Sequence, residues 1–210
     1  MQKSDLDALR ERRPSVVDIG AAAGAFVNYL AERLKHWDVY GVELRTDLIR
    51  SAKDFFGVHL LQGSVLDRNL LDDTSVDAIT MLGVVGIFDD LQVIAENVSR
   101  WVKPGGLVLL HGLFNPFEID VFVRYRESHR EDPGDLETGW NIFSQRTVRN
   151  CFITCGASSV QFFPFTMSGD LPRTPRDPLR SWTEELANGD RQIVNGLWLK
   201  QPQYVVEISY

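Results

Sequence analysis

The chain has 210 residues and a formal net charge of −7, and 44% of its residues are hydrophobic. Its 29 acidic residues outnumber its 22 basic ones, which argues against a domain that mainly binds nucleic acid. It contains no run of about 20 apolar residues that could span a membrane. Residues 1–13 are charged and lack the apolar run of a signal peptide, so we expect one cytoplasmic domain over residues 1–210, with a short leading segment at 1–14.

Strand and helix signals alternate over the first half of the chain. Strands are expected at residues 15–19, 39–44, 59–62, 76–82 and 107–111. Helices are expected at 25–34, at 47–55 with Asp47 as the cap, and at 91–101 after a cap at Asp89 or Asp90. This alternation predicts a doubly wound α/β fold with helices on both faces of a parallel sheet. Right-handed crossovers then bring all strand carboxyl ends to one edge, where ligands bind.

The pattern changes after residue 114. A helix capped by Ser144 is expected to run to about Thr154, followed by a strand at 159–165. Residues 167–190 suggest a long functional or mobile loop, and the runs 193–199 and 203–209 suggest a closing pair of strands. We expect segments 114–143 and 167–190 to lie on the substrate side of the sheet. Cys151 and Cys155, four residues apart, are expected to be reduced and mostly buried thiols.

The turn after the first strand is the most informative segment. It reads Gly20-Ala21-Ala22-Ala23-Gly24, so that bare backbone can approach a ligand closely. Glu43 ends the second strand, where a carboxylate can accept both hydroxyls of a ribose. Asp18 precedes the turn and would repel a pyrophosphate, but it suits a ligand with an ammonium or sulfonium charge. An NAD-dependent oxidoreductase is therefore the disfavoured alternative of the same architecture.

With these residues in place, the sequence resembles the class I S-adenosylmethionine-dependent methyltransferases, in particular those that act on small molecules. Five segments match the family motifs in order, at Val16–Gly24, Gly41–Leu44, Gly63–Val65, Val76–Ile79 and Val102–Leu107. The sequence departs from the family at two places. Ser64 stands where an aspartate is common, and residues 82–88 lack the Glu-His pair that many small-molecule members carry.

The resemblance implies a Rossmann-like methyltransferase fold: a mostly parallel, seven-stranded sheet with an antiparallel C-terminal strand. It implies S-adenosyl-L-methionine as the cofactor. The residues that it implies for cofactor binding are Asp18, Gly20, Ala21, Ala22, Gly24, Glu43, Leu44, Ser64, Val65 and Leu82.

Residues for the chemistry are expected near the same edge. His111 ends the fifth predicted strand and is the candidate base, with a hydrogen-bonded core histidine as the alternative. Trp140 can line a pocket for a ring, whereas Arg173 and Arg176 can clamp a phosphate or carboxylate; packing and ordinary surface charge are the alternatives. No cluster of His, Cys, Asp or Glu has metal-ligand spacing, so no metal is expected.

The function expected from these features is transfer of a methyl group from S-adenosyl-L-methionine to a small molecule, such as a sugar or a phosphorylated metabolite. The alternative from another class is a non-catalytic or regulatory S-adenosylmethionine-binding protein. Nucleic acid and membranes are not expected as partners.

Overall fold

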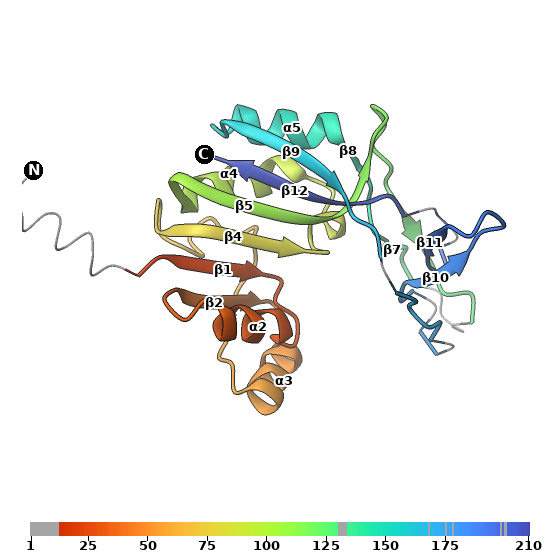
Figure 1. Cartoon of the computed structure of the whole chain (residues 1–210), viewed down its shortest axis with the longest axis horizontal. Helices are drawn as coiled ribbons and strands as arrows, with labels where there is room; N and C mark the ends of the chain where they lie inside the picture. The colour runs from red at the N-terminus through yellow and green to blue at the C-terminus, as the bar shows by residue number, and fades with distance from the viewer. Residues whose placement is uncertain are drawn as a thin grey trace, which may run out of the picture.

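The computed structural model describes residues 13–129, 134–167, 169–174, 176–177, 179–197, 199 and 201–210, so nearly all of the expected leading segment lies outside it. A central sheet has the strand order β3-β2-β1-β4-β5-β12-β9, and β8 pairs with β5 (Figure 1). Its strands are β1 (Ser15–Ile19), β2 (Asp38–Glu43), β3 (Leu61–Gln62), β4 (Val76–Leu82), β5 (Val102–Asn115), β8 (Phe143–Ser144), β9 (Ser159–Pro164) and β12 (Gln203–Ser209).

Strands β1 to β5 pair in parallel, whereas β12 runs antiparallel to both β5 and β9. The expected doubly wound, mostly parallel sheet with an antiparallel C-terminal strand is confirmed. The helical elements are α2 (Ala25–Arg33), α3 (Thr46–Phe56), the 3-10 turn η1 (Val85–Ile87), α4 (Leu91–Trp101) and α5 (Gln145–Thr154). None of the helices in the described ranges is long and apolar enough to span a membrane.

Two predicted helix caps are confirmed and one is wrong. The Asp90 carboxylate accepts a hydrogen bond from the Gln92 amide at the start of α4, and Ser144 Oγ accepts one from the Thr147 amide at the start of α5. Helix α3 begins earlier than expected, after Arg45, so that Asp47 lies in its first turn. There Asp47 favours the helix through the positive end of its dipole and through an ion pair with Arg45 at 2.6 Å.

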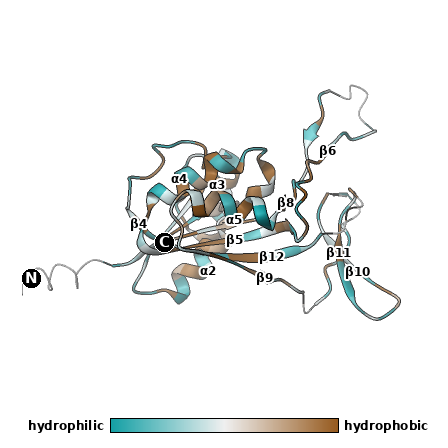
Figure 2. Cartoon of the chain, turned by 90° about the horizontal axis from the view of Figure 1, so that it is seen from above, coloured by the Kyte–Doolittle hydropathy of each residue, from teal (hydrophilic) through white to brown (hydrophobic). Residues whose placement is uncertain are grey.

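The helices cover both faces of the sheet (Figure 2). The larger core cluster joins β1, β4, β5 and β12 to α4 and α5, with Ile79, Ile94, Trp101 and Phe152 fully buried. A smaller cluster under α2 and α3 contains Ala21, Val27, Ala52 and Leu60. Burial of these apolar faces supplies the main driving force for folding and fixes the turns at the strand ends.

The C-terminal part differs from the expectation. The runs 193–199 and 203–209 do not form a hairpin with each other, because β12 fills the gap between β5 and β9 in the central sheet. Instead β11 (Arg191–Val194) pairs with β10 (Trp182–Glu185), which lies inside the expected loop 167–190. Asn188-Gly189 provides the turn, with Gly189 at φ +83°, and Asn-Gly is a strong hairpin signal.

A second departure concerns β5, which is longer than expected. It continues past His111 to Asn115, because β12 pairs with it as far as Leu113 and β8 takes over at Phe114. The strand therefore runs into the region that we call the cap, the described parts of residues 116–142 and 166–202. The cap holds the pair β6 (Arg124–Tyr125) and β7 (Glu137–Thr138) and the hairpin β10–β11. Figure 1 shows β7, β10 and β11 beyond the end of the sheet toward which β1 and β4 point.

Candidate functional site

The turn from β1 to α2 exposes backbone at the carboxyl edge of the sheet. The amides of Gly20 and Ala21 both donate to the Val42 carbonyl of β2, at 2.8 and 2.9 Å, which bends the chain sharply. Gly20 and Gly24 have φ values of +77° and +79°, a conformation that side chains rarely adopt. A Cβ on Gly20 would also collide with the side chain of Val84, from the loop that follows β4.

The Glu43 carboxylate organises this turn from the end of β2. Its Oε1 accepts hydrogen bonds from the Leu44 and Arg45 amides at 2.8 and 2.9 Å, and its Oε2 accepts one from the Ala22 amide at 2.9 Å. A carboxylate offers about four acceptor positions. In this arrangement Glu43 can accept one further hydrogen bond on Oε2, so the expected contact with both ribose hydroxyls would require one of the backbone bonds to be replaced.

The Asp18 side chain is buried near the carboxyl end of β1, only 3% exposed. Its Oδ1 accepts a hydrogen bond from Thr80 Oγ1 at 2.7 Å, and within the described residues it forms no ion pair. Burial raises the pKa of Asp18 from 3.8 to about 6, although the Thr80 hydrogen bond opposes the shift. A buried carboxylate without a cation is the group that a positively charged ligand would stabilise.

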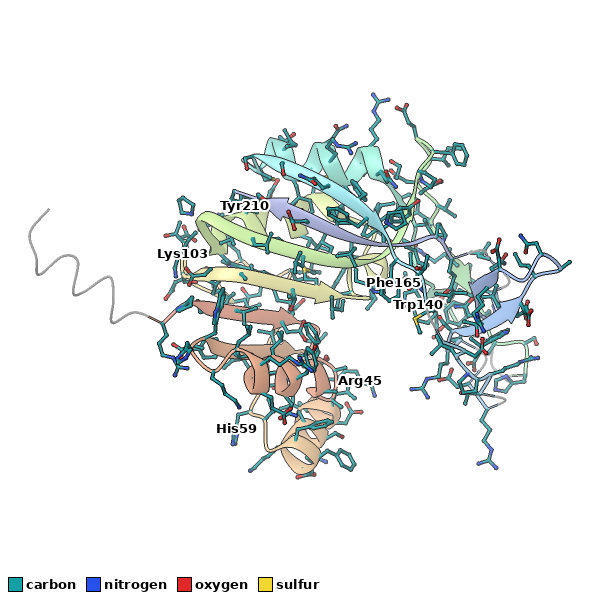
Figure 3. All side chains as sticks on the ribbon, in the orientation of Figure 1. Arg45, His59, Lys103, Trp140, Phe165 and Tyr210 are labelled. Carbon is teal, nitrogen blue, oxygen red and sulfur yellow. The ribbon has the colours of Figure 1, made fainter. Side chains whose placement is uncertain are left out.

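The other residues expected to bind the cofactor are spread along the same edge. Leu44 is 62% exposed beside Glu43, and Leu82 is 38% exposed at the end of β4. After β3, the Ser64 hydroxyl accepts a hydrogen bond from the Leu66 amide, whereas the Val65 side chain is buried in the core. Figure 3 shows Arg45, the neighbour of Leu44, toward the same end of the sheet as Trp140 and Phe165, with Lys103 at the opposite end.

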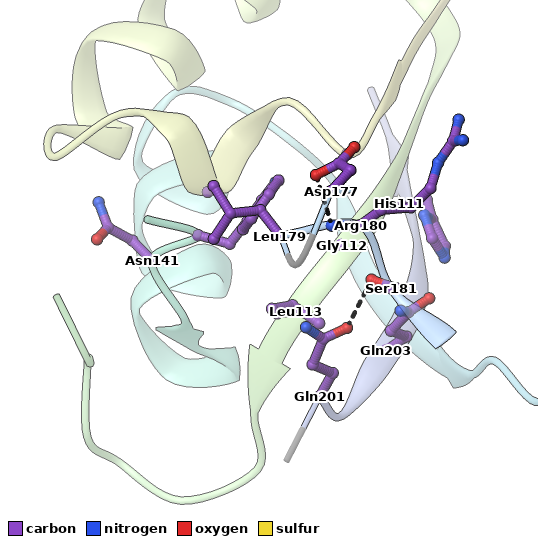
Figure 4. A pocket seen from close by; sticks show the side chains of 13 residues that line it. His111, Gly112, Leu113, Asn141, Asp177, Leu179, Arg180, Ser181, Gln201 and Gln203 are labelled. Atoms are coloured by element: carbon purple, nitrogen blue, oxygen red, sulfur yellow. Dashed lines mark hydrogen bonds between the residues drawn. The ribbon is translucent and has the colours of Figure 1, made fainter. Parts of the chain in front are cut away.

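A cavity of about 380 Å³ lies between this edge and the cap (Figure 4). It is bounded by the loop after β4, the middle of β5, the approach to β8, the segment before β10 and the approach to β12. We call it the acceptor cavity; its lining residues are Gly83, Gly86, His111, Gly112, Leu113, Trp140, Asn141, Asp177, Leu179, Arg180, Ser181, Gln201 and Gln203. Gly83 precedes Val84, which packs on Gly20, so the cavity adjoins the glycine turn.

His111 lines the acceptor cavity opposite Leu82, the last residue of β4. Its ring packs edge-on against Phe165 at 4.9 Å between centroids. The Nε2 atom is buried and has no hydrogen-bond partner among the described residues. Burial lowers the pKa of His111 below 6.5, and a hydrogen bond with Gln203 opposes this shift. The imidazole is therefore neutral at neutral pH and can act as a base.

The predicted substrate residues do not all meet at this cavity. Trp140 lines it, whereas Arg173 and Arg176 do not, and the Arg173 guanidinium lies over the Trp182 ring at 5.0 Å. The cap instead presents Arg180 and Asp177 to the cavity. Arg180 belongs to the same arginine-rich segment as Arg173 and Arg176. The path of the loop decides which of these arginines faces the cavity, and the sequence does not indicate that path.

Polar groups at the start of β12 and just before it also line the cavity, and no motif in the sequence points to them. Gln201 Oε1 accepts a hydrogen bond from Ser181 Oγ at 3.1 Å, which ties this approach to the segment before β10 (Figure 4). Gln203 adds an amide next to His111. Across the described ranges, no group of three or more His, Cys, Asp or Glu residues could hold a metal ion.

Comparison with known proteins decides the family. Residues 17–110 match a family model described as a methyltransferase domain. Residues 17–110 form a class I S-adenosylmethionine-dependent methyltransferase domain. The predicted cofactor, S-adenosylmethionine, is thereby confirmed. No curated protein sequence matches this methyltransferase.

Solved structures of methyltransferases share its fold. One from Thermotoga maritima is 18% identical, with a TM-score of 0.56 over 98% of this chain and 87% of that one. Another, from Methanosarcina mazei, is 15% identical, with a TM-score of 0.58 over 97% of this chain and 96% of that one. This chain spans 61% of the length of another matched protein, from Galdieria sulphuraria.

Proposed function

We propose that this methyltransferase transfers a methyl group to a small molecule bound in the acceptor cavity, with His111 as the base. The observation that carries the proposal is the position of His111, in a cavity at the carboxyl edge of β4 and β5, with an Nε2 atom that has no hydrogen-bond partner among the described residues. A volume of about 380 Å³ suits a small ligand rather than a macromolecular segment.

The residues at the edge fit the cofactor, which supplies an electrophilic methyl group on a positively charged sulfur. Asp18 offers a buried carboxylate with a raised pKa and, among the described residues, no cation paired with it. Glu43 offers one remaining acceptor position to a ribose hydroxyl. Gly20 and Gly24 leave the backbone of the turn free of side chains. The glycine turn would thus hold the cofactor next to Val84 and Gly83, which lead into the acceptor cavity.

The chain's own part in the chemistry is to position the acceptor and to receive its proton. Methyl transfer is an in-line displacement, so holding the two reactants in line supplies much of the rate. Neutral His111 can remove the proton of a hydroxyl as it attacks. Because Nε2 is covered in this structure, an acceptor reaches it after a neighbouring side chain moves, and Gln203 and Phe165 are the groups in contact with the ring.

The lining supports a hydroxylated acceptor, such as a sugar or a phosphorylated metabolite. Trp140 offers an aromatic surface for a ring, and the side chains of Asn141, Ser181, Gln201 and Gln203 bring donors and acceptors. Arg180 provides a guanidinium that can bind a phosphate or carboxylate of the acceptor.

The test is formation of S-adenosylhomocysteine from S-adenosylmethionine in the presence of a panel of sugars, sugar phosphates, amines and carboxylates. We expect turnover with one or more hydroxylated members of the panel. Binding of S-adenosylhomocysteine without turnover on any member would favour a non-catalytic S-adenosylmethionine-binding protein. Turnover on amines alone would contradict the role of His111 as a base for a hydroxyl.

A further inference from the structure

Asn141 is a buried residue in the wall of the acceptor cavity. It follows Trp140 in the chain, lines the cavity, and is only 1% exposed. Its backbone amide donates to the Gly86 carbonyl at 2.7 Å, across from the cap to the loop between β4 and α4. The close approach depends on glycine, because a Cβ on Gly86 would lie 2.8 Å from the Asn141 carbonyl oxygen.

The side-chain amide of Asn141 is fully used. Its Nδ2 donates to the Phe88 carbonyl and to Asp89 Oδ1, both at 2.9 Å. Its Oδ1 accepts from the Val123 amide at 2.9 Å and from Arg124 Nη1 at 3.2 Å. Two donors and two acceptors are the whole capacity of an asparagine side chain. A buried amide with every bond made joins its neighbours rigidly, whereas removing it would leave buried groups unpaired.

These bonds connect the two sides of the proposed site. Phe88 and Asp89 belong to the loop that begins at Gly83, and Val84 of that loop packs on Gly20 of the glycine turn. Val123 and Arg124 belong to the cap, and Arg124 also forms an ion pair with Asp89 at 2.5 Å. Asn141 and the Arg124–Asp89 ion pair thus attach the cap to the loop that packs on the glycine turn.

We propose that Asn141 is a positioning residue, which sets the place of Trp140 and of the cap wall relative to the cofactor side, and so orients the acceptor. The proposal rests on the proposed function for its catalytic consequence. Its structural content, the attachment of Trp140 and the cap to the loop after β4, can be tested without any acceptor.

The variant Asn141→Ala removes all four side-chain bonds, and Asn141→Asp keeps the acceptors but loses the donors to Phe88 and Asp89. Gly86→Ala does not change the Asn141 side chain, but its added methyl group pushes the Asn141 backbone away. The matched control is Asn97→Ala, which removes another buried asparagine, 5% exposed, that donates to the Val65 carbonyl and does not line the cavity.

The readout is the fluorine spectrum of protein labelled with 5-fluorotryptophan, with Trp140→Phe used to assign the Trp140 signal among the five tryptophans. We expect the Trp140 signal to shift or broaden in Asn141→Ala, Asn141→Asp and Gly86→Ala, and to stay in place in Asn97→Ala. An unmoved Trp140 signal in the Asn141 and Gly86 variants would overturn the proposal, even if their thermal stability fell. Should Asn141→Ala not fold, the other two variants decide the question.

Measurements of turnover then test whether Asn141 helps to orient the acceptor. With the hydroxylated compound that the wild type methylates fastest, Asn141→Asp should lower kcat/KM by ~10-fold or more, because small misplacements of a reactant are costly. The dissociation constant for S-adenosylhomocysteine should change by less than ~2-fold, since Asn141 does not touch the glycine turn. A parallel loss of cofactor affinity would overturn the positioning role. Absence of turnover in the wild type would count against the proposed function, whereas the fluorine spectrum judges Asn141 by itself.

Discussion

At the scale of single residues, Asp18 lowers the stability of the free protein at neutral pH but provides a negative charge for a cationic ligand. Its folded pKa of about 6 lies above the ordinary value of 3.8, because burial disfavours the charged form. The favourable contribution of the neutral carboxyl is therefore present below about pH 4 and is lost as the pH rises through 6. Above that range the protein holds a buried charge that a cationic ligand would compensate.

Replacing Asp18 with asparagine should change stability and ligand affinity in opposite directions. At pH 8 the variant should be more stable than the wild type by about 1–3 kcal/mol, and at pH 4 the difference should vanish. The same variant should bind S-adenosylhomocysteine more weakly. Thermal melting at the two pH values and calorimetric titration provide the measurements. A variant that is less stable at pH 8 would show that the Asp18 charge is already compensated in the free protein.

The Glu43→Ala variant should weaken binding of S-adenosylhomocysteine by at least ~10-fold, through loss of a charge-assisted hydrogen bond to the ribose. It should also lower the melting temperature, because the amides of Ala22, Leu44 and Arg45 lose their acceptor. Calorimetry on the folded variant measures the first effect. Unchanged affinity in a folded protein would remove Glu43 from the cofactor site.

If His111 is the base, activity should fall as the pH drops through its pKa, which burial holds below 6.5. The activity should therefore persist to a lower pH than an unperturbed histidine would allow. His111→Asn should lower kcat by about 10²- to 10⁴-fold and leave cofactor affinity unchanged. Steady-state rates across the pH range provide the measurement, and full turnover in the variant would reduce His111 to a packing residue.

At the scale of elements, the glycine turn is held by its fit to the loop after β4. Gly20→Ala should destabilise the fold and weaken cofactor binding, because the new methyl group meets the Val84 side chain in addition to the strained backbone. Gly105→Ala is the matched control, since Gly105 has a similar φ of +79° with open space around it. Denaturant melts should show the larger loss for Gly20→Ala. Equal losses would mean that backbone strain alone matters.

The segment 167–190 was expected to be a loop, and part of it is the strand β10. Amides of β10 that pair with β11 should therefore be protected from hydrogen exchange in the free protein. The residues before β10 that line the acceptor cavity, Asp177, Leu179, Arg180 and Ser181, should gain protection when cofactor and acceptor bind. Exchange measured with and without both ligands tests this. Uniform strong protection in the free protein would make the whole segment structural.

At the scale of the molecule, the first half of the fold could be predicted because its signals are local. The apolar runs of β1 and β4, the glycine turn and the Asp90 cap all lie within a few residues of what they specify. The position of β12 could not be predicted in the same way. Its partners β5 and β9 are distant in sequence, and an alternating apolar run does not say which strands it will join.

In the candidate site too, the residues near local sequence signals could be predicted and the others could not. His111 and Trp140 both line the acceptor cavity; His111 lies on a recognisable strand, and Trp140 lies shortly before Ser144, the recognisable N-cap of α5. Arg173 and Arg176 miss it, because the path of the cap segment depends on contacts such as Asn195 Nδ2 with the Leu179 carbonyl. Asn141 cannot be singled out from the sequence, because an asparagine between strand and helix signals resembles any loop residue until its burial is known.

A crystal structure with S-adenosylhomocysteine would show whether the cofactor binds at the glycine turn and faces the acceptor cavity. In that structure a ribose hydroxyl should lie on Glu43, the methionine amino group near Asp18, and the sulfur should face the cavity that holds His111 and Trp140. A ligand bound elsewhere, or bound at the turn with its sulfur directed away from that cavity, would contradict this placement of the cofactor.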